Sequence, residues 1–399
     1  MPVDYLQLKT KIEQIGKEEP DRLQEIAELS KTVQNYFQGY ANELDMLREK
    51  VAATAQVDPF IRCAKPASEP LNHRGPLPPI PTEATILAAD GSQITPDRHA
   101  QVYFFLINVG SIEMCTGSAA SPVTDVVTEL YYGQEIFDIG TISDSYVAQK
   151  RDQRERERLS ELVAEKSGLV LTITDGPLEI WGGKGQDSEE NRSFQEILES
   201  HKQALRALKA SGAITAGYVD KPRADLVVQL LELSQVQDNE LADVRKQRPF
   251  RGVTDAALFR KLLKPGERSA VFAIQSTSST DYTDDLALHF FYLNVGRAGR
   301  PSLARVEIPQ WVASNSQMLD DLHAVLVDQC KIMGGRPYPY LLHRSHEIAL
   351  VTYEEKDQII NMILAELDKQ DIEVGDISEK QAAKNLGGRR RFSLGKRSY

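Results

Sequence analysis

The sequence has 399 residues, of which 41% are hydrophobic and 26% are charged, and its formal net charge is −11. This length and composition predict a soluble globular protein with one large core or two smaller ones. The negative charge argues against a protein whose surface is largely covered by bound nucleic acid. It leaves a nuclease open, because phosphate contacts are local and a site that binds cations is itself acidic.

The sequence contains no segment apolar enough to span a bilayer, and its first residues lack the pattern of a secretion signal. Cys63, Cys115 and Cys330 are widely spaced, fit no zinc-binding pattern and cannot all pair with one another. We therefore expect a cytoplasmic protein that has no membrane partner.

The chain is expected to have four parts. Apolar residues spaced by three and four predict a helical segment at 1–55, either a hairpin or a pair of long helices. Closely spaced prolines predict a linker without regular elements at 56–83. Strands and helices alternate over 84–369, and residues 370–399, rich in Lys, Arg, Gly and Ser, predict a flexible basic tail.

Within 84–369 the apolar patterns predict both strands and helices. The predicted strands are 85–90, 101–109, 111–114, 169–174, 217–219, 269–274, 288–293, 304–308 and 348–353. The predicted helices are 144–166, 189–211, 223–235, 254–263, 315–333 and 354–369. A tight strand pair at 101–114 followed by strands separated by helices predicts an α/β fold, with a mixed sheet covered by helices on both faces.

Two aspartates follow predicted strands and precede glycine, in Asp90-Gly91-Ser92 and Asp175-Gly176-Pro177. A buried strand that delivers a carboxylate at its exit and then turns on glycine holds an anionic oxygen rigidly at the edge of a sheet. Two such carboxylates can share a divalent cation. Asp-Gly is also a common turn, which is the simpler interpretation of either copy alone.

The predicted helix 144–166 places Glu155 on its apolar, inward face, whereas Glu157 points elsewhere. A buried carboxylate needs a cationic partner. That partner can be a metal ion, or it can be Arg151 or Arg158 at helical spacing, and the helix alone does not decide between them.

Near the end of the chain, Tyr338 lies in a proline-rich turn and His346 precedes the predicted strand 348–353. A lone histidine is usually an ordinary hydrogen-bonding residue. Next to three carboxylates it becomes a candidate nitrogen ligand, one that suits Mn²⁺ better than Mg²⁺.

Several of these motifs occur in the same order in a known family. They are Ala89-Asp-Gly-Ser92, Asp175-Gly-Pro-Leu178, Gly217-Tyr-Val-Asp-Lys-Pro-Arg223, Arg305-Val-Glu-Ile-Pro309 and the block from Tyr338 to Ala349. Over roughly residues 84–355 the chain resembles the NurA nuclease family. The resemblance implies an RNase H-like core, a divalent metal, preferably manganese, and 5′ to 3′ exonuclease with single-strand endonuclease activity. It also implies a homodimer that works with the hexameric translocase HerA in processing DNA ends during double-strand break repair.

The resemblance implies a set of catalytic residues: Asp90, Glu155, Asp175, Tyr338 and His346. All of them except Tyr338 would be metal ligands. Either Glu155 or Glu157 matches the helical glutamate of the family, and the inward face favours Glu155. The chain departs from the family at Arg336, where an aromatic residue is expected, which leaves the conformation of that turn in question.

Phosphodiester hydrolysis in such a site uses two metal ions to neutralise the phosphate oxygens, with Tyr338 orienting the scissile phosphate. The candidates for contacts with the DNA backbone are Lys221, Arg223, Arg268 and Arg305, each of which can instead form an ordinary structural ion pair. Two other functions are considered. A non-catalytic adaptor of the translocase is disfavoured by the intact candidate ligands, and a nucleotide phosphohydrolase is disfavoured by the lack of a Walker motif.

Overall fold

The computed structural model describes residues 4–97, 100–139, 142–182 and 188–372. The chain divides into two compact units. The first unit comprises residues 1–82, 175–179 and 214–340, and the second comprises 83–174, 180–213 and 341–399. The predicted division into four parts stays a prediction, and most of the predicted basic tail lies outside the described residues.

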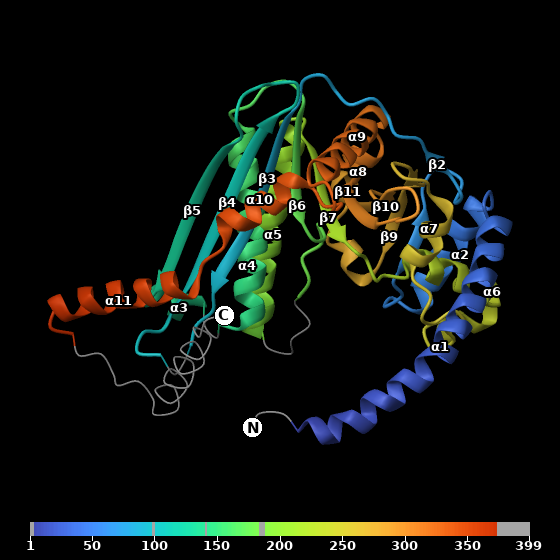
Figure 1. Ribbon diagram of the computed structural model, residues 1–399, viewed down its shortest axis with the longest axis horizontal. Coiled ribbons are helices and arrows are strands. Elements are labelled where there is room, and N and C mark those ends of the chain that lie inside the picture. Colours follow the sequence, from blue (N-terminus) through green and yellow to red (C-terminus); the bar gives the residue numbers. More distant parts are fainter. Residues whose placement is uncertain (1–3, 98–99, 140–141, 183–187, 373–399) are drawn as a thin grey trace, which may run out of the picture. The chain divides into compact units, whose positions relative to one another are not determined.

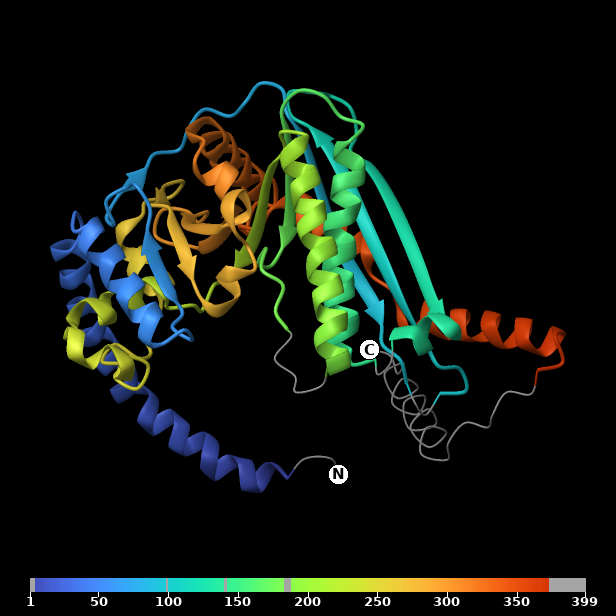
Figure 2. The same cartoon turned by 180° about the vertical axis from the view of Figure 1, so that it is seen from behind.

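The second unit is built on strands β3 (Thr85–Ile94), β4 (Phe104–Cys115), β5 (Val123–Tyr132) and β6 (Val170–Asp175). Strands β3, β4 and β5 form an antiparallel meander, and β6 joins it parallel to β3. Helices α4 (Asp144–Val163) and α5 (Ser188–Ala210) cover one face of this sheet (Figure 2). Helix α10 (Tyr340–Ala349) crosses the other face (Figure 1). The predicted α/β fold, a mixed sheet flanked by helices, is confirmed.

Helix boundaries in the second unit follow from capping. Helix α4 begins after Ser143, whose hydroxyl accepts a hydrogen bond from the Tyr146 N–H at 3.1 Å. Helix α11 (Tyr353–Lys369) begins after Thr352, which forms a capping box with Glu355. The apolar side of α11 packs against a small cluster from the sheet: Ile94, Val102, Phe104 and Leu106. The short helix α3 (Gln134–Ile139) follows β5.

The second unit differs from the local predictions in three places. The expected strand pair 101–109 and 111–114 is a single strand, β4, because Gly110 does not turn the chain. Strand β5 was not predicted, since it is an edge strand and keeps apolar side chains such as Val123 exposed. The expected strand 348–353 is instead the end of α10 and the cap of α11. Its apolar run therefore belongs to a helix and a connection.

In the first unit the strand order is β1-β9-β10-β11-β7, and β2 and β8 form a short pair beside β10. The strands are β1 (Cys63–Pro66), β2 (Arg74–Gly75), β7 (Ile214–Asp220), β8 (Arg268–Ser269), β9 (Phe272–Gln275), β10 (Leu288–Asn294) and β11 (Leu303–Pro309). The helices are α1 (Tyr5–Gly39), α2 (Leu44–Val57), α6 (Leu226–Gln235), α7 (Asp255–Leu262), α8 (Gln310–Ala313) and α9 (Ser316–Ile332). Buried aromatic rings, among them Phe259, Phe290 and Tyr292, form its core.

Helices α1 and α2 confirm the predicted helical segment at the start of the chain. The proline-rich segment was expected to contain no regular element, and this was wrong, because it forms β1 and β2. Proline is tolerated there since Pro66 is the last residue of β1, an edge strand that pairs only with β9. Among the described helices, none is both long and apolar enough to cross a membrane.

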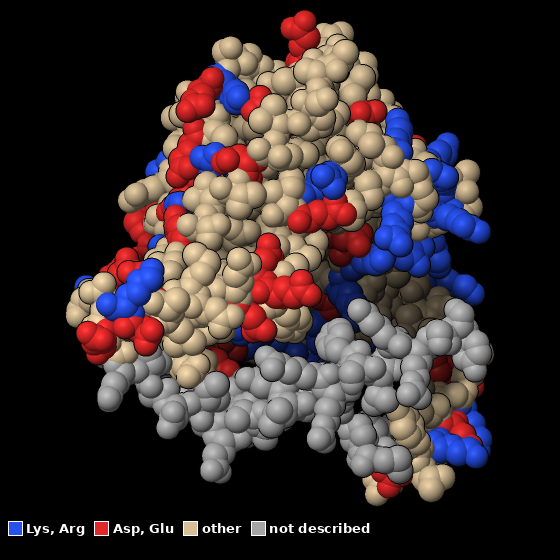
Figure 3. All heavy atoms as spheres, turned by 60° about the vertical axis from the view of Figure 1, so that its left-hand side comes forward, with Lys and Arg blue, Asp and Glu red and all other residues tan. Residues whose placement is uncertain are grey.

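Charged side chains of both signs are distributed over the surface. On the face drawn in Figure 3, most of the acidic groups lie at the left and centre of the view, and basic groups gather along its right-hand side. Any contact with an anionic polymer must therefore come from local groups of cations.

Candidate active site

Asp90 and His346 form the closest contact among the predicted site residues. His346 Nδ1 lies 2.7 Å from Asp90 Oδ2, so this ring nitrogen donates its proton to the carboxylate. Asp90 Oδ1 accepts a hydrogen bond from the Gly91 N–H at 2.9 Å. The Asp90 side chain is only 16% exposed, whereas that of His346 is 64% exposed. His346 therefore reaches from α10 to a carboxylate that the sheet holds in place.

The position of His346 depends on how α10 is fixed to the sheet. The Asn108 amide donates to Ala349 O at 2.7 Å, and the Ser92 hydroxyl donates to the same carbonyl. Gly110 on β4 lets the helix approach, because a Cβ at this position would lie 2.6 Å from Ala349 N. These supporting residues were not predicted from the sequence. The period-two pattern of β3, which puts Ser92 on the same face as Asp90, was the available signal.

Glu155 is 3% exposed and pairs with two arginines of its own helix. Its carboxylate lies 3.0 Å from Arg156 Nη1 and 3.4 Å from Arg151 Nε. Burial raises the pKa of Glu155 well above its usual value, Arg156 opposes this rise, and Asp152 and Asp90 add to it. The predicted alternative of a salt bridge to Arg151 is thus present, whereas Arg158 pairs with Asp125 and Glu161 instead.

Gly91 has a different role from the one expected. Strand β3 continues through it to Ile94, so the predicted turn after Asp90 was wrong. A Cβ on Gly91 would lie 2.5 Å from Arg151 Cγ and 3.0 Å from Glu155 Oε1. The missing side chain therefore lets α4 pack closely against β3. Because side chains alternate along a strand, Glu155 approaches the Gly91 face of β3 while His346 approaches the Asp90 face.

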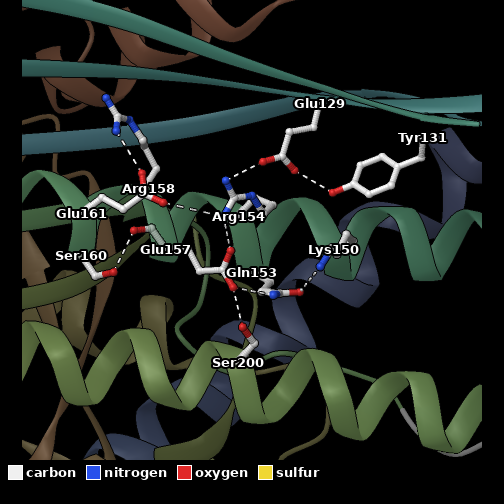
Figure 4. Close-up of polar contacts among 10 residues, drawn as sticks. All are labelled: Glu129, Tyr131, Lys150, Gln153, Arg154, Glu157, Arg158, Ser160, Glu161 and Ser200. Atoms are coloured by element: carbon white, nitrogen blue, oxygen red, sulfur yellow. Dashed lines mark hydrogen bonds and ion pairs between the residues drawn. The ribbon is translucent and has the colours of Figure 1, made fainter. Parts of the chain in front are cut away.

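Glu157, the alternative to Glu155, points toward α5 (Figure 4). It accepts hydrogen bonds from the Gln153 amide at 2.5 Å, from the Ser200 hydroxyl and from Arg154. Burial alone would raise its pKa, but these three bonds outweigh burial and lower it. Arg154 also pairs with Glu129 of β5 at 2.6 Å, so this network joins β5, α4 and α5. Glu157 is a structural residue of the helix layer.

The predicted turn after Asp175 is present. Asp175 is the exposed last residue of β6, and Gly176 follows it with a φ of +85°, in the left-handed region that favours glycine. The Gly176 N–H donates to Tyr218 O at 2.8 Å, and the Leu178 N–H donates to Glu307 Oε2 at 3.0 Å. The turn that carries Asp175 is therefore held at both of these backbone positions.

Tyr338 lies before α10 in the first unit and is half-buried. Its ring meets that of Tyr218 edge to face, with the ring centroids 5.7 Å apart. Its N–H donates to Arg336 O at 2.9 Å, which makes a tight turn at the position where an aromatic residue was expected. Tyr338 and Asp175 belong to the first unit, whereas Asp90, Glu155 and His346 belong to the second.

The four candidate DNA contacts fall into two groups. Lys221 and Arg223 are exposed on the loop that follows β7. Arg268 is 6% exposed and forms two hydrogen bonds with Glu69, at 2.9 and 2.8 Å. Arg305 is 8% exposed and pairs with Glu307 at 2.7 Å. The structure favours structural pairing for these two arginines, since a buried guanidinium that already binds a carboxylate is not available to a phosphate.

Carboxylates and an imidazole are donors that Mn²⁺ accepts, so the chemistry of the predicted residues fits a metal ion. Among the residues that the structure describes, however, no three or more His, Cys, Asp or Glu side chains are gathered closely enough to hold one. The backbone provides a further constraint. Ala89 and Thr174 are paired in the parallel ladder of β3 and β6, and the next residues along the two strands are Asp90 and Asp175.

The sequence matches the family model of the NurA domain over residues 84–351. No curated protein matches it significantly. A NurA solved with dAMP and manganese is 11% identical, with 81% of this chain and 94% of that chain covered and a TM-score of 0.33. The catalytic domain of human endonuclease V is 11% identical, with 80% and 98% covered and a TM-score of 0.30. The RNase H1 called LC9 is 16% identical, with 35% and 63% covered and a TM-score of 0.21. At these low values the family assignment rests on the sequence match.

Proposed function

The chain belongs to the NurA family, and from this membership we propose that it is a divalent-metal-dependent nuclease that hydrolyses DNA. The observation that carries the proposal is the contact of 2.7 Å between Asp90 on β3 and His346 on α10. An exposed imidazole held by a largely buried carboxylate is a common arrangement around catalytic metal ions, because the carboxylate fixes the tautomer and the orientation of the ring.

We propose that Asp90, Glu155, Asp175 and His346 hold manganese, or alternatively magnesium, in a site for two ions. When bound, two divalent cations neutralise the phosphate oxygens and favour in-line attack by water. Asp90 keeps the proton of His346 on Nδ1, which leaves the lone pair on Nε2 free to act as a ligand. The raised pKa of Glu155 reflects a buried carboxylate that gains from nearby positive charge.

Tyr338 is proposed to orient the scissile phosphate through its hydroxyl, while Lys221 and Arg223 contact the DNA backbone. Both cations are exposed and able to reach a ligand. Arg305 is assigned a positioning role instead, since it pairs with Glu307, and Glu307 in turn accepts the Leu178 N–H in the turn after Asp175.

The finer activity is proposed from the family. It comprises 5′ to 3′ exonuclease and single-strand endonuclease action at DNA ends in double-strand break repair, together with a HerA-type hexameric translocase. We also propose a homodimer. Helix α1 supports it, because Leu6, Ile12 and Leu23 are 81%, 61% and 57% exposed, and a second copy would bury such a surface. A monomeric mass in light scattering at micromolar concentration would count against the dimer.

The test is cleavage of labelled single- and double-stranded DNA by the purified protein with Mn²⁺, Mg²⁺ or EDTA. We expect cleavage with either metal, none in EDTA, and none by Asp90→Ala. The matched control is Glu354→Ala, which removes an exposed carboxylate from α11 and leaves cleavage unchanged. Hydrolysis of nucleotides without cleavage of DNA would indicate a phosphohydrolase. A wild-type protein that binds DNA or a translocase but cleaves nothing would be an adaptor.

A further inference from the structure

The first unit contains a cavity of about 490 Å³ to which no role has been assigned so far. Its wall is formed by the hairpin between β10 and β11, the turn before β8 and the end of α9. Three cations line it, namely Arg297, Arg300 and Lys331, and no aspartate or glutamate does. Apolar side chains complete the wall, among them Leu77, Val295 and Val327.

The hairpin that carries the two arginines is rigidly built. The Asn294 side chain is 1% exposed, accepts hydrogen bonds from the N–H groups of Gly296 and Ser302 at 3.0 and 3.2 Å, and donates to Leu263 O at 2.9 Å. Arg297 and Arg300 exchange both backbone hydrogen bonds, at 3.1 and 2.9 Å. The two guanidinium groups thus project from a fixed backbone, so little backbone entropy is lost when they bind a ligand together.

The positive charges of this hairpin repel one another when no ligand is bound. Arg297 and Arg300 are directly opposite each other across the bridge, and like charges in opposite positions destabilise a sheet. Among the described residues, neither of them pairs with a carboxylate, and Lys331 does not either. Arg297 instead donates to the carbonyl of Gly334, at the rim of the same cavity. An anion in the cavity would relieve this repulsion.

We propose that this cavity binds the phosphate group of a nucleotide, with the arginines on the phosphate and the apolar wall against the sugar or base. Guanidinium groups pair with phosphate through two parallel hydrogen bonds, and a cavity of this size is typical for a small ligand. Pro337 lines the cavity and is followed by Tyr338. The phosphate is therefore assigned to the DNA strand that Tyr338 is proposed to contact; only this last step rests on the proposed nuclease function.

The test is binding of a short labelled single-stranded oligonucleotide. Binding is measured by fluorescence anisotropy in EDTA, so that the test does not depend on cleavage. We expect the double variant Arg297→Ala/Arg300→Ala to bind about tenfold more weakly. The dependence of log affinity on log salt concentration should also fall, by about 0.7 for each phosphate that the variant no longer neutralises. The matched control, Arg260→Ala/Lys261→Ala, removes the same charge from the exposed end of α7 and should change binding little.

A second arm distinguishes a strand from a free nucleotide, by calorimetric titration with dAMP and with inorganic phosphate. Weaker oligonucleotide binding by the pocket variant supports a phosphate of the DNA strand. Weaker dAMP binding alone supports the same pocket with a free nucleotide. Equal reductions in affinity for the pocket and control variants, or none in either, would overturn the proposal. If the double variant has a lower melting temperature than the wild type, the single variant Lys331→Ala is used to repeat the test. Cleavage by the wild type is measured separately, so failure of the nuclease assignment is recognised on its own.

Discussion

Two Asp-Gly pairs present a carboxylate to the proposed site in different ways. Strand β3 continues past Asp90 and Gly91, and Asp90 is paired with Gly110 in the middle of the ladder. Strand β6 ends at Asp175, and Gly176 then turns the chain with a φ of +85°. Gly91 is needed for the close approach of α4, whereas Gly176 is needed for its backbone conformation. The same dipeptide serves as a packing contact in one place and as a turn in the other.

This difference decides how each carboxylate is held. Asp90 lies within a ladder that bonds to β4 on one side and follows the pairing with β6 on the other, so its backbone is fixed by the sheet. The turn after Asp175 is fixed by two hydrogen bonds, to Tyr218 O and to Glu307. We therefore expect substitutions near Asp90 to shift its position little, because the sheet fixes its backbone. The position of Asp175 depends on these two hydrogen bonds.

The largest expected effects come from the two carboxylates. Asp90→Ala and Asp175→Ala should each lower the rate of metal-dependent cleavage by at least about a hundredfold, because electrostatic stabilisation is usually the largest catalytic contribution. Folding should be kept, since removing a carboxylate relieves repulsion among acidic groups and the pair of Asp90 with the exposed His346 adds little stability. Cleavage rates and melting temperatures without metal are the measurements. An active Asp175→Ala beside an inactive Asp90→Ala would contradict the proposal that both carboxylates hold the metal.

The next effect concerns the helix that packs on Gly91. Glu155→Gln should remove most cleavage activity, while Glu157→Gln should leave it nearly unchanged. Glu157→Gln should instead lower the melting temperature, because the carboxylate joins Arg154 to Ser200 of α5. Steady-state cleavage and thermal melts of both variants separate the two roles. An inactive Glu157→Gln with an active Glu155→Gln would reverse the assignment of the ligand and leave the nuclease function standing.

The sequence predicted those features that depend on local pattern. The helix face of Glu155, the turn at Gly176 and most of the alternating strands and helices follow from periodicity and turn chemistry. It did not predict that β3 and β4 run straight through Gly91 and Gly110. Each of these glycines makes room for a helix far away in the sequence, Arg151 of α4 in one case and Ala349 of α10 in the other. Without knowledge of the partner, a glycine in a strand is most simply explained as a turn.

In the candidate site, too, contacts between residues far apart in the sequence were not predicted. Glu69, the partner of Arg268, becomes visible only after folding, whereas Glu307 lies two residues from Arg305 in the sequence and is the partner that strand alternation allows. His346 was expected before a strand, but it lies in α10, and the residues that follow lead to Thr352, which caps α11. In both cases the residue type was informative, while its surroundings depended on tertiary contacts.

A smaller effect tests the packing role of Gly91. Gly91→Ala should lower the free energy of unfolding by about 1 to 3 kcal/mol, because the new methyl group overlaps the Arg151 side chain. Arg151→Ala should restore part of this stability, so that a double-mutant cycle gives a favourable coupling. The control is Gly39→Ala, where nothing lies within 4 Å of the added atom. Additive effects in the double variant would show that Gly91 is required for its backbone instead.

The smallest expected effect completes the comparison at Gly176. Nothing lies within 4 Å of a Cβ added there, so any decrease in stability comes from the backbone conformation alone. Gly176→Ala should lower the free energy of unfolding by about 1 to 2 kcal/mol, which is the cost of a left-handed residue with a side chain. Gly176→Asn should cost less, since asparagine tolerates this conformation, and Arg151→Ala should rescue neither variant. Denaturant unfolding of the wild type, the two single variants and their combinations with Arg151→Ala measures these differences. Equal decreases for alanine and asparagine, or rescue by Arg151→Ala, would mean that the two Asp-Gly pairs are held in the same way after all.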